Sequence, residues 1–77
     1  MKIIDVLQEL HPQFDYAHSN DFISDGFIDS FDLVRLIAAL EAAYGIHIAG
    51  TDVLAENFRN ISSISQMLSH YGVEQSE

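Results

Sequence analysis

Apolar residues recur at helical spacing in three parts of the chain, with polar residues between them. The first pattern predicts a helix over about 2–10, which cannot continue past Pro12 because the residue before a proline disfavours helical backbone. The strongest pattern predicts a helix over 30–44. The last one predicts a helix over about 61–71, ended by Gly72. No strand alternation persists, so we predict an all-α fold.

The connections between these helices differ in length. Residues 11–29 mix turn formers with large apolar side chains, and so long a loop is uncommon unless it is functional or held down. Thr51 could cap a short helix over about 52–57, and Asn60 or Ser62 could cap the last helix. We therefore predict a four-helix bundle, three long helices and one short, with a long first loop. The residues that could hold this loop across the core are Phe14, Tyr16, Phe22, Ile23, Phe27 and Ile28. The residues predicted in the core are Leu7, Leu36, Leu40, Phe58, Ile64 and Leu68.

The predicted helix over 30–44 has apolar residues on two opposite sides. The first side is an ordinary core face formed by Leu33, Leu36, Ile37, Leu40 and Tyr44. The second side is a stripe formed by Phe31, Val34, Ala38 and Ala42, with Arg35 among them. Either the first loop covers this stripe, or the stripe stays partly exposed and receives a partner. Exposed apolar patches usually mark interaction sites, which favours the second interpretation.

Composition limits the classes of protein that fit. A chain of 77 residues predicts one domain over 1–77, with an ordered core over about 2–72 and a flexible tail over 73–77. The absence of Cys excludes disulfides and thiolate metal sites. A formal net charge of −9 disfavours nucleic acid and anionic membranes as partners and suits docking on basic patches of proteins. The apolar runs are too short to insert into a membrane, and the N-terminus lacks a signal-peptide pattern. We expect a cytoplasmic monomer.

Catalytic and metal-binding patterns are incomplete. The histidines are scattered without metal-ligand spacing, and no nucleophile motif or phosphate-binding glycine loop is present. A calcium-loop register does pass through Asp21, Asp25, Gly26, Asp29 and Asp32. However, Ile23 stands at one of its ligand positions, and its last position holds Asp in place of the longer Glu. We therefore predict neither a metal site nor an enzyme. The four histidines are His11, His18, His47 and His70.

Residues 26–34, Gly-Phe-Ile-Asp-Ser-Phe-Asp-Leu-Val, resemble the attachment motif of acyl carrier proteins and of the related peptidyl and D-alanyl carrier domains. Residues 36–48 resemble the second helix of these proteins and its exit, and 56–64 resemble the approach to their last helix. In this family the serine of Asp-Ser-Leu/Phe carries 4′-phosphopantetheine. The resemblance thus implies attachment at Ser30, with Asp29 as its motif neighbour. It also implies a partner-binding surface that includes Phe31, Asp32, Val34, Arg35 and Ala38.

The chemistry of the motif fits this resemblance. A serine at a helix N-terminus presents its hydroxyl beside unpaired backbone N–H groups, which favour a phosphodiester. A chain without Cys cannot form a thioester itself, so the arm would supply the thiol. The resemblance implies a non-catalytic carrier that a transferase modifies from coenzyme A. Loading and transfer enzymes of a fatty-acid, polyketide, nonribosomal-peptide or D-alanylation type pathway would then use it.

The chain also departs from typical fatty-acid carriers, which have Leu-Gly-x-Asp-Ser and a strongly acidic second helix. Here the motif is Gly-Phe-Ile-Asp-Ser, and Arg35, Ala38, Ala42 and Ala43 stand where acids are often found. This form is more similar to stand-alone carriers of amino-acid or specialised pathways. The alternative is a helical adaptor that carries no arm and uses the same face only to bind partners.

Overall fold

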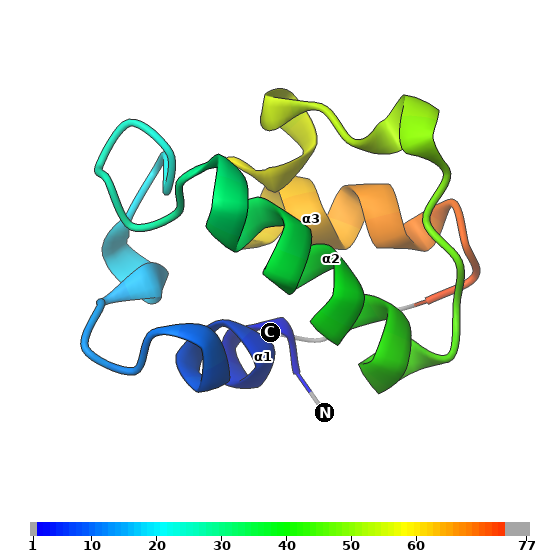
Figure 1. The fold of residues 1–77 in the computed structure, drawn as a ribbon, viewed down its shortest axis with the longest axis horizontal. Coiled ribbons are helices and arrows are strands. Elements are labelled where there is room, and N and C mark those ends of the chain that lie inside the picture. The colour runs from blue at the N-terminus through cyan, green and yellow to red at the C-terminus, as the bar shows by residue number, and fades with distance from the viewer. Residues whose placement is uncertain (1, 74–77) are drawn as a thin grey trace.

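The computed structural model describes residues 2–73, and its regular structure there is entirely helical (Figure 1). The three α-helices are α1 (Ile3–Leu10), α2 (Ser30–Tyr44) and α3 (Ile61–Ser69). The three short 3₁₀ segments are η1 (Tyr16–His18), η2 (Gly50–Asp52) and η3 (Ala55–Phe58). None of these helices is long and apolar enough to cross a bilayer.

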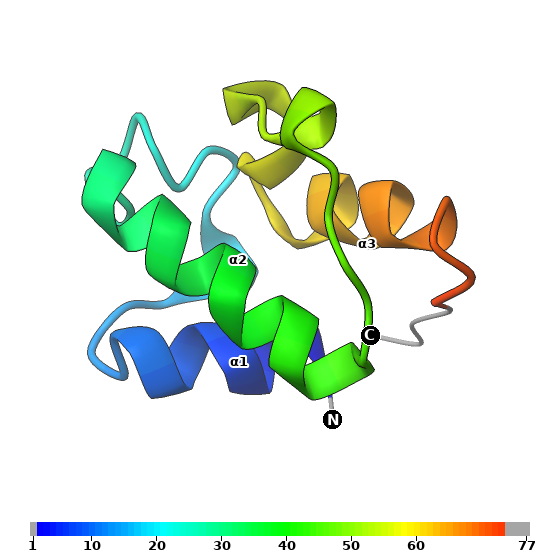
Figure 2. The ribbon, with the colours of Figure 1, turned by 45° about the vertical axis from the view of Figure 1, so that its right-hand side comes forward.

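Helix α1 packs against both α2 and α3, and η3 packs against α3. Figures 1 and 2 show α2 crossing the front of the molecule with α1 beside it, while the segments η2 and η3 lie near α3. The core fills the space between the three helices, and all six residues predicted in it are fully buried. On α2, Leu36 and Leu40 are buried, and the predicted core face is thereby confirmed.

The first loop, residues 11–29, is held to the core by aromatic rings. Phe14 stacks on Phe27 with ring centroids 4.5 Å apart, and Tyr16 meets Phe22 edge-on at 5.3 Å. Tyr16, Phe22 and Ile28 are buried, as expected from the loop's apolar residues. Ile23 is the exception among the six residues predicted to hold this loop. It remains 37% exposed because its amide turns back onto the Asp21 carboxylate in a tight polar turn.

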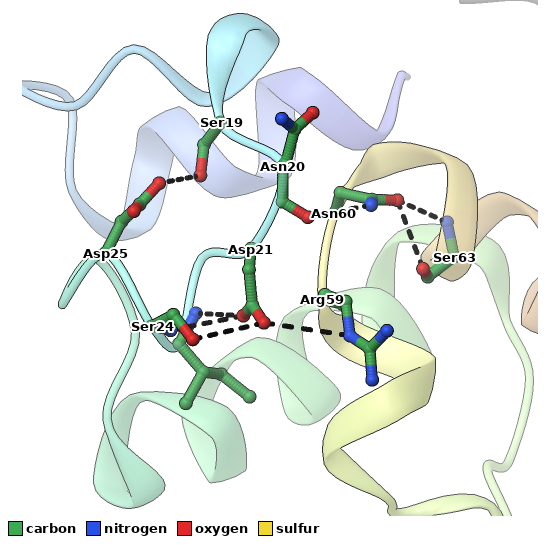
Figure 3. A network of polar contacts seen from close by, with 9 residues as sticks. Ser19, Asn20, Asp21, Ser24, Asp25, Arg59, Asn60 and Ser63 are labelled. Carbon is green, nitrogen blue, oxygen red and sulfur yellow. Dashed lines mark hydrogen bonds and ion pairs between the residues drawn. The ribbon is translucent and has the colours of Figure 1, made fainter.

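Two long-range hydrogen bonds tie this first loop to the start of α3. The Phe22 amide donates to the carbonyl of Arg59, with an N···O distance of 2.6 Å. The Asn60 side-chain amide donates to the carbonyl of Asn20 at 2.9 Å (Figure 3). Oδ1 of the same Asn60 side chain accepts from the Ser63 amide and thereby caps α3. Asn60, and not Ser62, is therefore the cap of the last helix.

The predicted short helix over 52–57 is wrong, so residues 2–73 contain three α-helices and not four. A three-residue turn interrupts it: the Leu54 amide donates to the Asp52 carbonyl, with Val53 at φ −81° and ψ 75°. The Asp52 carboxylate also accepts from the Tyr71 hydroxyl, whose oxygen accepts in turn from the Ala49 amide. Thr51 lies inside η2 and caps no helix, because the N-cap residue of η2 is Ala49.

The end of α3 differs from the prediction. The helix ends at Ser69, and the backbone then reverses at Gly72, which has a φ of 79° that favours glycine. The Val73 amide donates to the Leu68 carbonyl, and the Val73 side chain packs against the core. Val73 thus contacts the core, while the ordered core over about 2–72 and the flexible tail over 73–77 stay a prediction. The rest of that tail, 74–77, lies outside the described residues.

Candidate functional site

The start of α2 is fixed by a reciprocal pair of hydrogen bonds that leaves Ser30 out. The Asp32 amide donates to Oδ1 of Asp29 at 2.8 Å, and the Asp29 amide donates to Oδ2 of Asp32 at 3.4 Å. Asp29 is therefore the N-cap, and Ser30 is the first helical residue. The Ser30 side chain is exposed, and its hydroxyl forms no hydrogen bond within residues 2–73. Its Oγ is thus accessible from solvent.

The segment that leads into α2 explains why Ser30 is presented in this way. The amides of Phe27 and Ile28 both donate to the Phe22 carbonyl, at 2.8 and 3.2 Å. Gly26 makes the turn before them with a φ of 78°. The Ile28 side chain is buried. A buried anchor therefore lies two residues before Ser30, and the capping aspartate fixes the chain between them.

The first backbone amides of α2 are available to an anion. The amides of Asp32 and Leu33 are used by the side chain and the carbonyl of Asp29. The amides of Ser30 and Phe31 have no acceptor in the described part of the chain. Unpaired N–H groups at the positive end of a helix favour a negatively charged group. A phosphodiester on the Ser30 oxygen would lie in this environment.

Asp32 turns away from solvent, toward the end of α1. Its Oδ1 lies 3.0 Å from Nε2 of His11 and 3.6 Å from the Arg35 guanidinium, and 14% of the carboxylate side chain is exposed. Partial burial raises the pKa of Asp32, but the hydrogen bonds from His11 and Asp29 and the charges of His11 and Arg35 outweigh it and lower that pKa. Asp32 is therefore a stable anion at neutral pH. Its side chain supports the helix start more than it faces a partner.

The predicted second stripe of α2 is exposed. Phe31 and Val34 are 75% and 66% exposed, and Ala38 and Ala42 are also exposed. The Arg35 side chain is 53% exposed. The interpretation that the first loop covers this stripe is wrong, because the rings of the loop pack against one another and the core. The structure therefore brings Ser30, Phe31, Val34, Arg35 and Ala38 onto one exposed surface.

The carboxylates of the apparent calcium register do not gather around one point. Asp21 accepts from the amides of Ile23 and Ser24 and lies 3.7 Å from Arg59, whereas Asp25 accepts from the Ser19 hydroxyl (Figure 3). Within residues 2–73 no group of acidic and histidine side chains could hold a metal ion. The hydrogen bonds from Ser24, chiefly from its amide, and from Ile23 lower the pKa of Asp21. These aspartates organise the loop.

The sequence did not reveal that His11 is the partner of Asp32. His11 follows α1 as its C-cap, and 20 residues separate it from Asp32 in the chain, so no local pattern joins the two. The other paired histidines are more exposed: His18 lies 2.7 Å from Asp15, and His47 lies 3.3 Å from Glu41. A surface depression between α1 and α3 contains none of the predicted site residues. The candidate site is a projecting hydroxyl and not a cleft.

One comparison identifies a related family. The family model described as "Phosphopantetheine attachment site" matches residues 2–68, which include α1, α2 and all of α3 except Ser69. Members of this family bind 4′-phosphopantetheine covalently. No curated protein and no solved structure matches the chain.

Proposed function

Because the chain belongs to the phosphopantetheine attachment site family, we propose that it is a carrier protein whose arm is attached to Ser30. The assignment of Ser30 is supported by the different roles of Asp29 and Ser30 at the start of α2. Asp29 makes the capping hydrogen bond, so the Ser30 hydroxyl stays exposed and unbonded at the first helical position. Ser24 and Ser63 lack this combination: the Ser24 hydroxyl donates to Asp21, and the Ser63 hydroxyl donates to Asn60.

The surroundings of Ser30 fit a phosphodiester. The unpaired amides of Ser30 and Phe31 and the positive end of α2 favour the negative charge. The nearby Asp32 carboxylate is offset by His11 and Arg35. Attachment would form a bond between the Ser30 oxygen and the pantetheine-bearing phosphorus of coenzyme A, break the pyrophosphate bond, and release adenosine 3′,5′-bisphosphate. The serine proton would pass to a base of the transferase.

The arm, when attached, supplies a thiol that carries acyl or aminoacyl groups as thioesters. The chain contains no Cys, so it offers no competing thiol of its own. We propose that the protein itself is not an enzyme and presents its cargo to loading and transfer enzymes. The motif Gly-Phe-Ile-Asp-Ser favours an amino-acid or specialised pathway over general fatty-acid synthesis. The exposed stripe of Phe31, Val34, Arg35 and Ala38 is the proposed contact surface for these enzymes.

Intact mass spectrometry tests the proposal directly. The purified chain is incubated with coenzyme A and a broad-specificity phosphopantetheinyl transferase, and we expect one added phosphopantetheine group. Ser30→Ala should abolish the addition, while the matched variant Ser24→Ala, in the preceding loop, should be modified normally. Modification that survives Ser30→Ala would reject the assigned residue. A folded wild-type chain that accepts no arm would favour the adaptor function.

A further inference from the structure

Both acidic side chains of α2 are engaged in holding other parts of the chain. The Asp32 carboxylate pairs with His11 at the end of α1. The Glu41 carboxylate accepts from the Ile48 amide at 2.9 Å and lies 3.3 Å from His47, both in the segment that follows α2. Side-chain exposure is 14% for Asp32 and 29% for Glu41. Neither carboxylate is therefore presented freely on the exposed side of the helix.

The exposed side of α2 consequently does not share the strong negative charge of the whole chain. After the capping aspartate, its exposed stripe consists of Phe31, Val34, Ala38 and Ala42, with Arg35 as its charged member. The formal net charge of the chain is −9, and Arg35 is one of only three Lys and Arg residues. In Figures 1 and 2 no other ribbon lies over the front of α2. An apolar surface with one cation, whose guanidinium lies 3.6 Å from the Asp32 carboxylate, thus stands beside Ser30 and Asp29.

The position of this stripe decides which partner must cover it. Val34 lies one helical turn after Ser30, and Ala38 lies one further turn along the same side. An enzyme that closes around the Ser30 hydroxyl must therefore contact them. A basic enzyme surface would meet Arg35 there as a like charge, which is unfavourable at an interface. A surface with apolar side chains and a carboxylate opposite Arg35 would be complementary.

We propose, building on the proposed function, that the transferase that modifies Ser30 recognises α2 through apolar contacts and a carboxylate that pairs with Arg35. Arg35 is then a specificity-determining residue, since arginines next to apolar contacts often dominate interface energies. Apart from Asp29, the exposed N-cap residue beside Ser30, the remaining acidic residues lie outside α2 in the sequence. A second copy of the chain could also bind this stripe, so the experiment must distinguish dimerisation from transferase binding.

Arg59 provides a matched control for Arg35. Each guanidinium side chain is 53% exposed, and each lies near one aspartate, at 3.6 Å for Arg35 and at 3.7 Å for Arg59. Arg35→Glu and Arg59→Glu change the net charge equally, but only the first alters the exposed stripe of α2. Arg35→Ala and Arg35→Lys complete the set. Thermal unfolding shows that each variant is folded before its kcat/KM for arm attachment is measured with a broad-specificity transferase and coenzyme A.

We expect Arg35→Glu to lower kcat/KM by about tenfold or more, Arg35→Ala to lower it less, and Arg35→Lys to retain most of it. Arg59→Glu should stay within about twofold of the wild type. If the transferase instead recognises an acidic helix, Arg35→Glu should raise kcat/KM. That result would overturn the inference. Equal effects of Arg35→Glu and Arg59→Glu would also overturn it.

Two further outcomes are decisive. A wild-type chain that sediments as a dimer, and that Arg35→Glu converts to a monomer, would assign the stripe to a second copy and reject the inference. If the wild-type chain accepts no arm at all, this result rejects the proposed function itself and not specifically the role of Arg35. Normal wild-type attachment with an unaffected Arg35→Glu variant rejects the inference alone.

Discussion

Nε2 of His11 lies 3.0 Å from Oδ1 of Asp32, so the residue that follows α1 is joined to the first turn of α2. The same aspartate oxygen lies 3.6 Å from Arg35, and its other oxygen accepts from the Asp29 amide. The His11 carbonyl in turn accepts from the Tyr16 hydroxyl at 2.9 Å. One aspartate therefore connects the end of α1, the first loop and the turn that presents Ser30.

His11→Phe should destabilise the protein, because it removes the hydrogen bond to Asp32 while keeping a ring against Phe14. We expect a loss of about 1 kcal/mol in the free energy of unfolding, measured by urea denaturation at pH 7. His18→Phe is the control, since the pair of His18 with Asp15 is largely exposed and should contribute little. Equal losses for the two variants would show that the His11 contact carries no special stability.

Stability should fall in acid partly through Asp32. Its pKa is lowered in the folded protein, so it stabilises the fold above the unfolded-state value of about 4. That contribution is lost as the pH falls further, through the folded-state pKa, because the protonated carboxyl no longer pairs with His11 as an anion. Asp32→Asn should therefore lose less stability between pH 6 and pH 3 than the wild type. Exposed Glu9→Gln on α1 is the control, and a wild-type slope for Asp32→Asn would contradict the prediction.

Leu40→Ala should cost about 2–5 kcal/mol of unfolding free energy, because Leu40 is fully buried and its loss leaves a cavity between the helices. Val34→Ala lies on the same helix, but Val34 is 66% exposed, so we expect a change of no more than about 0.5 kcal/mol. Denaturant unfolding followed by circular dichroism measures both values. Similar losses for the two variants would contradict the assignment of two different faces to α2.

Val34→Asp should leave the thermal midpoint nearly unchanged and slow attachment of the arm. The new carboxylate would stand one turn after Ser30, where the proposed partner contact is apolar. Ala17→Asp adds the same charge at an exposed residue of η1, away from α2, and should be modified at the wild-type rate. The comparison requires thermal unfolding and initial rates of arm attachment. A wild-type rate for Val34→Asp would remove this residue from the contact surface.

The sequence predicts α2 well because its limits are local. Asp29 caps the helix by accepting from the Asp32 amide, only three residues later in the chain. Gly45 ends the helix with a left-handed φ of 64°. The second stripe is also evident from the pattern of apolar residues along this one helix, whereas its exposure depends on where the first loop packs. Ser30 is exposed because the residue before it, Asp29, makes the capping hydrogen bond.

Features that depend on distant residues could not be predicted. The interrupted helix near Asp52 is accompanied by a hydrogen bond from Tyr71, 19 positions away. The pairing of His11 with Asp32 likewise joins two segments without a shared pattern. Nothing near Val73 in the sequence indicates its contact with Leu68 and the core. Hydrophobic periodicity describes one helix at a time, whereas these contacts form only when several elements meet.

The hydrogen bonds from Phe22 to Arg59 and from Asn60 to Asn20 have a consequence during synthesis on the ribosome. The second of them joins residues 40 positions apart, so the loop before Ser30 can reach its final geometry only after Asn60 has emerged. Contacts of such separation close late, because a long segment must be ordered before they form. We therefore expect arm attachment to follow translation of nearly the whole domain. Stalled nascent chains that expose Ser30 but still hold Arg59 inside the ribosomal tunnel should be poor transferase substrates, and equal modification of short and long nascent chains would contradict this order.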